Sequence, residues 1–263
     1  MNTDDLLKIA KNACKKAGKA ILKIYKWDFD IEIKDDGSEV TIADKLSNKV
    51  IEKILKQTNI PILSEEKKDN FDRLNSKYLW VIDPLDWTKD FIKKTWEFSI
   101  MIWLVKYWEP ILWAVYLPTK NKLYFAKKWK WSFLEQNWRV VKLLVKKTNS
   151  DIILVSRNHL TDLEIKVINK IWFKSIPCGS IWVKLWLIAE WKAWNYLTSY
   201  NNFKEWDTCA PEIILKEAWW KITDKLWKKL EYNKKLNYHN GCIATNWVKH
   251  QIILDTLKKQ WLN

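Results

Sequence analysis

The stretch Trp80-Val81-Ile82-Asp83-Pro84-Leu85-Asp86-Trp87-Thr88-Lys89-Asp90-Phe91 decides how this chain is interpreted. Tyr78 to Ile82 is predicted to be a strand that ends at Asp83-Pro84, and Lys89 to Phe91 is predicted to begin a helix. Pro84 stiffens the turn, so the carboxylates of Asp83 and Asp86 and the carbonyl of Leu85 can converge on one point. Hard cations such as Mg²⁺ prefer such oxygen ligands. Because a helix N-terminus beside a bound cation attracts anions, the stretch predicts a phosphate site.

Regular elements flank this stretch on both sides. Apolar residues recur every three or four positions from Leu6 to Ile24 and again in 43–57, which predicts two amphipathic helices. A short strand over 60–63 leads into Glu65-Glu66. Downstream, alternating apolar segments predict a meander of three strands, at 99–105, 111–117 and 123–126.

The pattern changes near residues 146–151 to strand 152–155, helix 161–171, strand 173–176 and helix 181–190. This change predicts two domains. We expect an α+β domain over residues 1–147, carrying the acidic loops, and an α/β domain over residues 148–263 that completes the site.

Composition limits the classes of protein that the chain can be. Its 263 residues, 48% of them hydrophobic, are enough for a large buried core. The net charge of +15 comes almost entirely from Lys, and no basic stretch is interleaved with exposed aromatics, so a diffuse lysine surface is favoured over a nucleic-acid groove. Four widely spaced cysteines indicate reduced thiols, and no segment is typical of a signal peptide or membrane anchor. We expect a cytoplasmic protein.

The quoted stretch resembles the W-V-x-D-P-L-D-G-T-K-x-F signature of the inositol monophosphatase superfamily, the lithium-sensitive, magnesium-dependent phosphomonoesterases. The pattern also asks for an upstream acidic pair, found at Glu65-Glu66, and for W-D followed after eleven residues by G-G. Here Trp206-Asp207 is followed, after eleven residues, by Trp219-Trp220. The resemblance implies the layered αβαβα sandwich of that superfamily, which combines α+β and α/β parts.

Further motifs are similar to those of the 3'(2'),5'-bisphosphate nucleotidase branch. Residues 205–212 (Glu-Trp-Asp-Thr-Cys-Ala-Pro-Glu) and 221–224 (Lys-Ile-Thr-Asp) resemble segments of that branch. Residues 156–159 resemble its S-R-S-H motif and residues 187–193 its L-I-A-E-G-K-A motif. Enzymes of the branch convert adenosine 3',5'-bisphosphate, the by-product of sulfate activation in sulfur assimilation, into AMP.

The resemblance implies a role for each matching residue. The metal ligands for two or three Mg²⁺ ions would be Glu65, Asp83, Asp86, Asp207 and the Leu85 carbonyl. Thr88, paired with Asp44, would orient and deprotonate the attacking water. The residues that would hold the substrate are Glu65, Leu85, Asp86, Trp87, Thr88, His159, Ser180, Lys184 and Asp207.

Structural interpretations of several of these residues stay open. Asp44 stands where a helix begins, so it can be a cap. Lys184 can be an ordinary surface lysine, and His159 can be a cap at the start of a helix. His239 and His250 have no identifiable partners in the sequence and are expected to be structural.

The chain departs from the family in one systematic way, because tryptophan stands at many family glycine positions. Trp87, Trp182, Trp191, Trp219 and Trp220 occupy such positions, and Trp108, Trp129 and Trp131 stand in turns or loops. The chain has 21 Trp and 4 Gly, and only Trp80 and Trp206 match family tryptophans. Reading the other 19 as Gly would bring the glycine count to 23, an ordinary share. The hypothesis is that a reassigned codon, such as UGA, encodes glycine in the source organism.

We expect a Mg²⁺-dependent phosphatase, inhibited by Li⁺, that acts on a small nucleotide bisphosphate as a monomer or homodimer without a nucleic-acid partner. The nearest alternative is an inositol monophosphatase or a fructose-bisphosphatase. A remote alternative is a degenerate, basic nucleic-acid-binding protein. The acidic residues argue against the last, because carboxylates repel a phosphate backbone unless cations intervene.

Overall fold

The computed structural model describes residues 1–35, 37–143, 150–157, 160–178, 195–199, 203–205, 208, 212, 216–217, 221–236, 238–245 and 249–261. They belong to two compact units. The first unit comprises Met1–Lys142 with Asn233–Lys235, and the second comprises Leu143–Tyr232 and Leu236–Asn263. No helix among these residues is both long and apolar enough to cross a bilayer.

The first unit is built on a seven-stranded sheet of order β3-β4-β5-β6-β7-β8-β9. Strands β3 and β4 are parallel, and the pairs from β4 to β8 are antiparallel. The strands are β3 (Ile62–Ser64), β4 (Tyr78–Asp86), β5 (Ser99–Lys106), β6 (Glu109–Leu117), β7 (Lys122–Lys127), β8 (Ser132–Gln136) and β9 (Arg139–Leu143). The predicted meander is therefore present as β5, β6 and β7.

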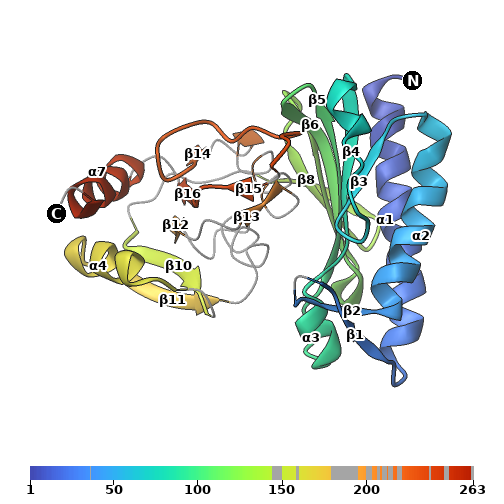
Figure 1. The fold of residues 1–263 in the computed structure, drawn as a ribbon, viewed down its shortest axis with the longest axis horizontal. Helices are drawn as coiled ribbons and strands as arrows, with labels where there is room; N and C mark the ends of the chain where they lie inside the picture. Colours follow the sequence, from blue (N-terminus) through green and yellow to red (C-terminus); the bar gives the residue numbers. More distant parts are fainter. Residues whose placement is uncertain are drawn as a thin grey trace. The chain divides into compact units, whose positions relative to one another are not determined.

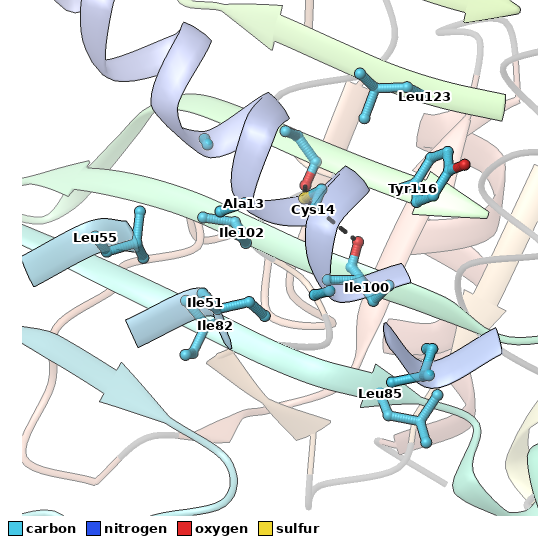
Figure 2. Packing of buried hydrophobic residues seen from close by; sticks show 14 of the residues in the cluster. Ala13, Cys14, Ile51, Leu55, Ile82, Leu85, Ile100, Ile102, Tyr116 and Leu123 are labelled. Carbon is cyan, nitrogen blue, oxygen red and sulfur yellow. Dashed lines mark hydrogen bonds between the residues drawn. The ribbon is translucent and has the colours of Figure 1, made fainter. Parts of the chain in front are cut away.

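Two long helices, α1 (Thr3–Tyr25) and α2 (Ile42–Leu55), lie side by side over one face of this sheet (Figure 1). The amphipathic pattern that predicted them supplies the buried side. In α1 it includes Ala10, Cys14 and Ile21, all fully buried. They belong to one core cluster with Ile100 and Ile102 of β5 and other apolar residues of the sheet, and Figure 2 shows Cys14 beside these two isoleucines. The 3.6-residue spacing of apolar side chains thus both favours the helix and gives it the apolar face that covers the sheet.

Gly18 lets α1 approach the sheet closely. A Cβ atom at this position would lie 2.6 Å from the ring of Tyr116 on β6. The thiol of Cys14, one turn earlier, donates to the Ala114 carbonyl of the same strand at 3.5 Å. The helix and β6 are therefore in direct contact along this line, and burial raises the pKa of the Cys14 thiol well above its ordinary value.

Smaller elements complete the first unit. Strands β1 (Ile31–Ile33) and β2 (Glu39–Thr41) form an antiparallel pair before α2, and one residue separates β4 from α3 (Thr88–Ile92). The sequence predicted neither β1 nor β2. With three residues each, and all of β1 exposed, they are too short to show an apolar alternation.

The second unit contains a five-stranded sheet of order β11-β10-β12-β16-β14. Its strands are β10 (Ile152–Ser156), β11 (Lys174–Cys178), β12 (Asn195–Thr198), β14 (Lys221–Thr223) and β16 (Cys242–Thr245). Helices α4 (Asp162–Lys170) and α7 (His250–Trp261) share an apolar core with it, and β13 (Phe203–Lys204) pairs with β15 (Tyr238–His239). The helix expected over 181–190 and the predicted domain boundary between residues 147 and 148 fall outside the described residues.

Candidate active site

Adjacent parallel strands bring Glu65 and Asp83 to the same end of the sheet. Ser64 of β3 pairs with Ile82 of β4, and the Glu65 N–H donates to the Ile82 carbonyl at 3.2 Å. Glu65 follows Ser64 and Asp83 follows Ile82, so the two acidic residues come directly after the same strand pair. Asp83 is buried, whereas the side chain of Glu65 is 28% exposed. Parallel pairing explains why residues 18 positions apart in the chain end up as neighbours.

A bulge in β4 places Asp83 and Asp86 on one face of the sheet. Asp83 pairs with Met101 and Asp86 pairs with Ser99, so three steps along β4 match two steps along β5. In a regular strand a spacing of three would put the two carboxylates on opposite faces. The extra residue of the bulge restores a common face. Met101 and Ser99 lie two residues apart on one face of β5, and their partners Asp83 and Asp86 lie on that same face. Leu85 instead packs in the core with α1 and α2.

Hydrogen bonds hold this bulge. The Leu85 N–H donates to Asp83 Oδ1 at 3.1 Å, and the Ser99 hydroxyl donates to Asp86 Oδ2 at 3.4 Å. The Ser47 hydroxyl of α2 donates to the Pro84 carbonyl at 2.6 Å. The predicted end of the strand at Asp83-Pro84 was wrong, because β4 continues to Asp86. Pairing with β5 resumes after the bulge. Pro84 lies within the bulge, where no N–H is needed for pairing with β5.

Asp44 joins α2 to the start of α3. Its Oδ2 atom accepts from the backbone N–H and the hydroxyl of Thr41, both at 2.7 Å, which closes a capping box on α2. Its Oδ1 atom lies 2.9 Å from the hydroxyl of Thr88. Asp44 is therefore a helix cap and a partner of Thr88 at once, through different oxygens. The sequence left these two interpretations as alternatives, and the structure shows both contacts.

Burial changes the acidity of Asp44. The residue is fully buried, and loss of solvation raises the pKa of its carboxyl group, while the hydrogen bonds from Thr41 and Thr88 oppose the rise. The Thr88 hydroxyl also lies 3.2 Å from the Leu85 carbonyl. Thr88 thus sits between the carboxylate of Asp44 and the backbone of the bulge.

Lys34 is a site residue that the sequence did not single out. Its Nζ atom lies 2.7 Å from Glu66 Oε1 and 3.7 Å from Glu65 Oε1. Burial lowers the pKa of Lys34, but the charges of Glu65 and Glu66 outweigh that effect and leave the pKa raised. Nothing in the sequence distinguished this lysine from the many others, because only folding brings the β1–β2 connection beside the acidic pair.

The donor set fits a hard divalent cation in its chemistry. Asp83, Asp86, Glu65 and the Leu85 carbonyl offer only oxygen, and two of the carboxylates share a face. Within the described ranges, no three His, Cys, Asp or Glu side chains lie close enough together to hold a metal ion. Asp207, the fourth predicted carboxylate, lies outside those ranges, as do the predicted substrate contacts His159, Ser180 and Lys184.

Trp87 separates the bulge from α3. Its backbone has φ 76° and ψ 47°, in the left-handed region, and its carbonyl accepts from the N–H groups of Asp90 and Phe91 at 2.9 Å. Its side chain is partly buried against the α1–α2 core. Position 87 therefore starts α3 with a conformation that residues carrying a Cβ resist.

Comparison with known proteins identifies the family. The family model described as "Inositol monophosphatase family" matches residues 2–262. The chain belongs to the inositol monophosphatase family. The predicted resemblance is thereby confirmed, and the protein is a phosphatase of this family, whose enzymes use Mg²⁺ and act on phosphate esters.

Relatives within the inositol monophosphatase family include bisphosphate nucleotidases. The chain is 33% identical to the 3'(2'),5'-bisphosphate nucleotidase CysQ of Haemophilus influenzae, over 83% of this chain and 84% of that protein. It is 32% identical to the protein of the same name from Shigella flexneri, over 90% and 96% of the two chains.

Solved structures confirm the predicted fold class. CysQ from Bacteroides thetaiotaomicron superposes with a TM-score of 0.78 at 30% identity, covering 92% of this chain and 97% of that one. The suhB protein from Bartonella henselae superposes with a TM-score of 0.81 at 20% identity, covering 97% and 99%. The second likeness supports the fold alone.

Proposed function

We propose that this protein is a Mg²⁺-dependent phosphomonoesterase that hydrolyses the 3'-phosphate of adenosine 3',5'-bisphosphate, giving AMP and phosphate. The observation that carries the proposal is the contact between Asp44 and Thr88 beside the bulge of Asp83 and Asp86. The choice of substrate is supported by the identity to proteins named as bisphosphate nucleotidases over most of both chains. The wide spacing of the cysteines favours a cytoplasmic location.

The proposed metal ligands are Glu65, Asp83, Asp86, Asp207 and the Leu85 carbonyl. Two or three Mg²⁺ ions held there would supply a Lewis acid that polarises the phosphate ester and acidifies a water. Carboxylate and carbonyl oxygens are the ligands that Mg²⁺ prefers, which supports this assignment. The bulge serves to keep the carboxylates of Asp83 and Asp86 on the face where the ester binds.

Thr88 and Asp44 would move the proton. The Thr88 hydroxyl can direct its own hydrogen to Asp44 Oδ1, which leaves the Thr88 oxygen free to accept a proton from an attacking water. As the water oxygen bonds to phosphorus, the ester P–O bond breaks on the opposite side, and the leaving oxygen takes up a proton from solvent to become the 3'-hydroxyl. The raised pKa of Asp44 favours this role, since the carboxylate is a better base than an exposed one.

The remaining predicted contacts would bind the nucleotide. His159, Ser180, Lys184 and position 87 are proposed to hold its sugar and phosphate groups. Lys184 is assigned to binding alone, so Lys184→Ala should mainly raise KM.

The test is a side-by-side assay of phosphate release from three substrates: adenosine 3',5'-bisphosphate, inositol 1-phosphate and fructose 1,6-bisphosphate. Each is measured with Mg²⁺, with Mg²⁺ and Li⁺, and after chelation. The chain is assayed as printed and with glycine at the family glycine positions quoted above. We expect the highest kcat/KM with the nucleotide, inhibition by Li⁺ and no turnover after chelation. A clear preference for the inositol or fructose phosphate would replace the proposed substrate, and turnover that survives chelation would remove the mechanism.

A further inference from the structure

Many tryptophans of this chain occupy a backbone conformation that suits glycine. Among the described residues, 14 that are not glycine have positive φ, and seven of these are tryptophan. Four of the others are asparagine, which tolerates the left-handed region. A bulky side chain on Cβ is disfavoured there, whereas glycine adopts the region freely. The seven residues are Trp87, Trp96, Trp129, Trp131, Trp138, Trp172 and Trp227.

Trp138 stands at the glycine position of a tight hairpin. Asn137 and Trp138 alone connect β8 to β9, with φ values of 49° and 66°. Positive φ at both central residues defines a type I′ turn, and Asn-Gly is the favoured pair for it. Asn137 is the expected first residue of this pair, so the position that departs from the rule is the one occupied by Trp138.

Trp172 stands at the glycine position that ends a helix. After α4, the Phe173 N–H donates to the Ile168 carbonyl at 3.1 Å, and the Trp172 N–H donates to the Asn169 carbonyl at 3.3 Å. These two bonds form a Schellman motif in which Trp172, with φ 57°, is the left-handed residue. Phe173 and Ile168 share the apolar core, as the motif requires. Glycine is the usual residue at this position.

Trp227 closes a third standard turn. The Trp227 N–H donates to the Asp224 carbonyl at 3.2 Å, and the Asp224 N–H donates to the Lys228 carbonyl at 3.0 Å. The loop is thus a turn followed by a left-handed residue, with φ 71° at Trp227. Three-residue loops of this kind take glycine at the left-handed position.

The indole rings at several of these positions contribute little burial. Trp129, Trp138 and Trp172 are 81%, 96% and 88% exposed. A ring in water gains too little from burial to offset an unfavourable backbone conformation. Neither packing nor conformation explains tryptophan at these positions.

Trp80 shows the opposite behaviour and serves as an internal comparison. It lies in β4, is fully buried, and donates from Nε1 to the Thr58 hydroxyl at 3.0 Å. Its backbone is not among those with positive φ. This position uses both the volume and the N–H group of an indole.

We propose that the working protein carries glycine at the seven left-handed tryptophan positions and keeps tryptophan at position 80. The left-handed backbone of the seven tryptophans does not depend on the proposed function. Its consequence for the candidate active site is local, because position 87 lies between Asp86 and Thr88, and glycine there gives the turn without strain.

A single peptide from the protein, purified from the cells that encode it, tests the proposal. Trypsin should release residues 78–89, Tyr-Leu-Trp-Val-Ile-Asp-Pro-Leu-Asp-Trp-Thr-Lys, which contain positions 80 and 87. Fragment masses should show tryptophan at 80 and glycine at 87, and the peptide over residues 131–139 should show glycine at 131 and 138. Tryptophan at position 87 would overturn the proposal, and so would glycine at position 80. In the gene, the codon shared by the seven positions should differ from that of position 80.

Recombinant chains provide a second readout. Replacing the seven tryptophans by glycine should raise Tm by roughly 10 °C or more relative to the chain as printed. The matched control, Trp80→Gly, should lower Tm because it removes buried volume and the bond to Thr58. A sevenfold variant no more stable than the printed chain would contradict the conformational argument.

Discussion

The hydroxyl of Thr88 lies 2.9 Å from Asp44 Oδ1, although 44 residues separate the two in the chain. Asp44 belongs to the first turn of α2, and Thr88 is the first residue of α3. The contact joins a buried acid to a hydroxyl beside the bulge that carries Asp83 and Asp86.

Thr88→Val should lower kcat by roughly 10² to 10⁴-fold while leaving KM little changed, because it removes the group proposed to pass the proton. Thr88→Ser is the matched control, since it keeps a hydroxyl that can reach Asp44. Steady-state kinetics on the preferred substrate provide the measurement, with Tm recorded for both variants. Equal activity of the Val and wild-type enzymes would exclude Thr88 from proton transfer.

Asp86→Asn should abolish turnover, by on the order of 10³-fold or more, because the variant removes a charge proposed to hold Mg²⁺. Isothermal titration with Mg²⁺ should show weaker binding, and circular dichroism should be unchanged. Asp5→Asn, which changes a half-exposed acid in the first turn of α1, is the control for a lost negative charge. Normal Mg²⁺ affinity in Asp86→Asn would contradict its assignment as a ligand.

Arg73 should be important for the stability of the first unit. Its buried guanidinium pairs with Asp69 at 2.7 Å and donates to the Lys234 carbonyl at 2.9 Å. Arg73→Leu should lower Tm by roughly 10 °C, because it removes the buried ion pair with Asp69 and the hydrogen bond to the Lys234 carbonyl, a loss of about 3 kcal/mol. Arg139→Leu is the control, since Arg139 is exposed, and should change Tm by a degree or two. Similar Tm values for the two variants would show that the buried contacts of Arg73 add little.

His250 should make stability fall with acid. It is buried between the hydroxyls of Thr223 and Thr245, at 3.2 Å from Nε2 and 3.1 Å from Nδ1. Burial, helped by the charge of Lys221, lowers its pKa from 6.5 to about 3. Between these values the unfolded chain binds a proton that the folded chain does not, so acid favours unfolding.

The expected loss of stability from this one group is about 2 kcal/mol between neutral pH and pH 5. Urea unfolding at several pH values measures it. His250→Gln keeps hydrogen-bonding atoms but does not titrate, so its stability should depend less steeply on pH in this range. Parallel pH profiles for the variant and the wild type would show that His250 is not responsible.

How far the sequence predicted the fold can be seen in particular elements. The helices α1 and α2 follow from apolar periodicity, because each buries one face. The strands β5 to β7 follow from short apolar runs, because they are mostly buried on both faces. The strands β1 and β2 were missed because each has only three residues, too few to show an apolar alternation, and all of β1 is exposed. The end of β4 was misplaced because Pro84 usually ends a strand, and only pairing with β5 shows that it continues.

The sequence by itself determined the family and singled out the acidic residues of the candidate site, since both depend on residue type and spacing along the chain. Only the tertiary structure decided how Asp83 and Asp86 come to share a face, at what distance Asp44 meets Thr88, and that Lys34 lies beside Glu65 and Glu66. The physical reason is that a bulge, a parallel strand pair and a helix packed on a sheet set distances between residues remote in the chain. Local sequence patterns carry no information about such distances.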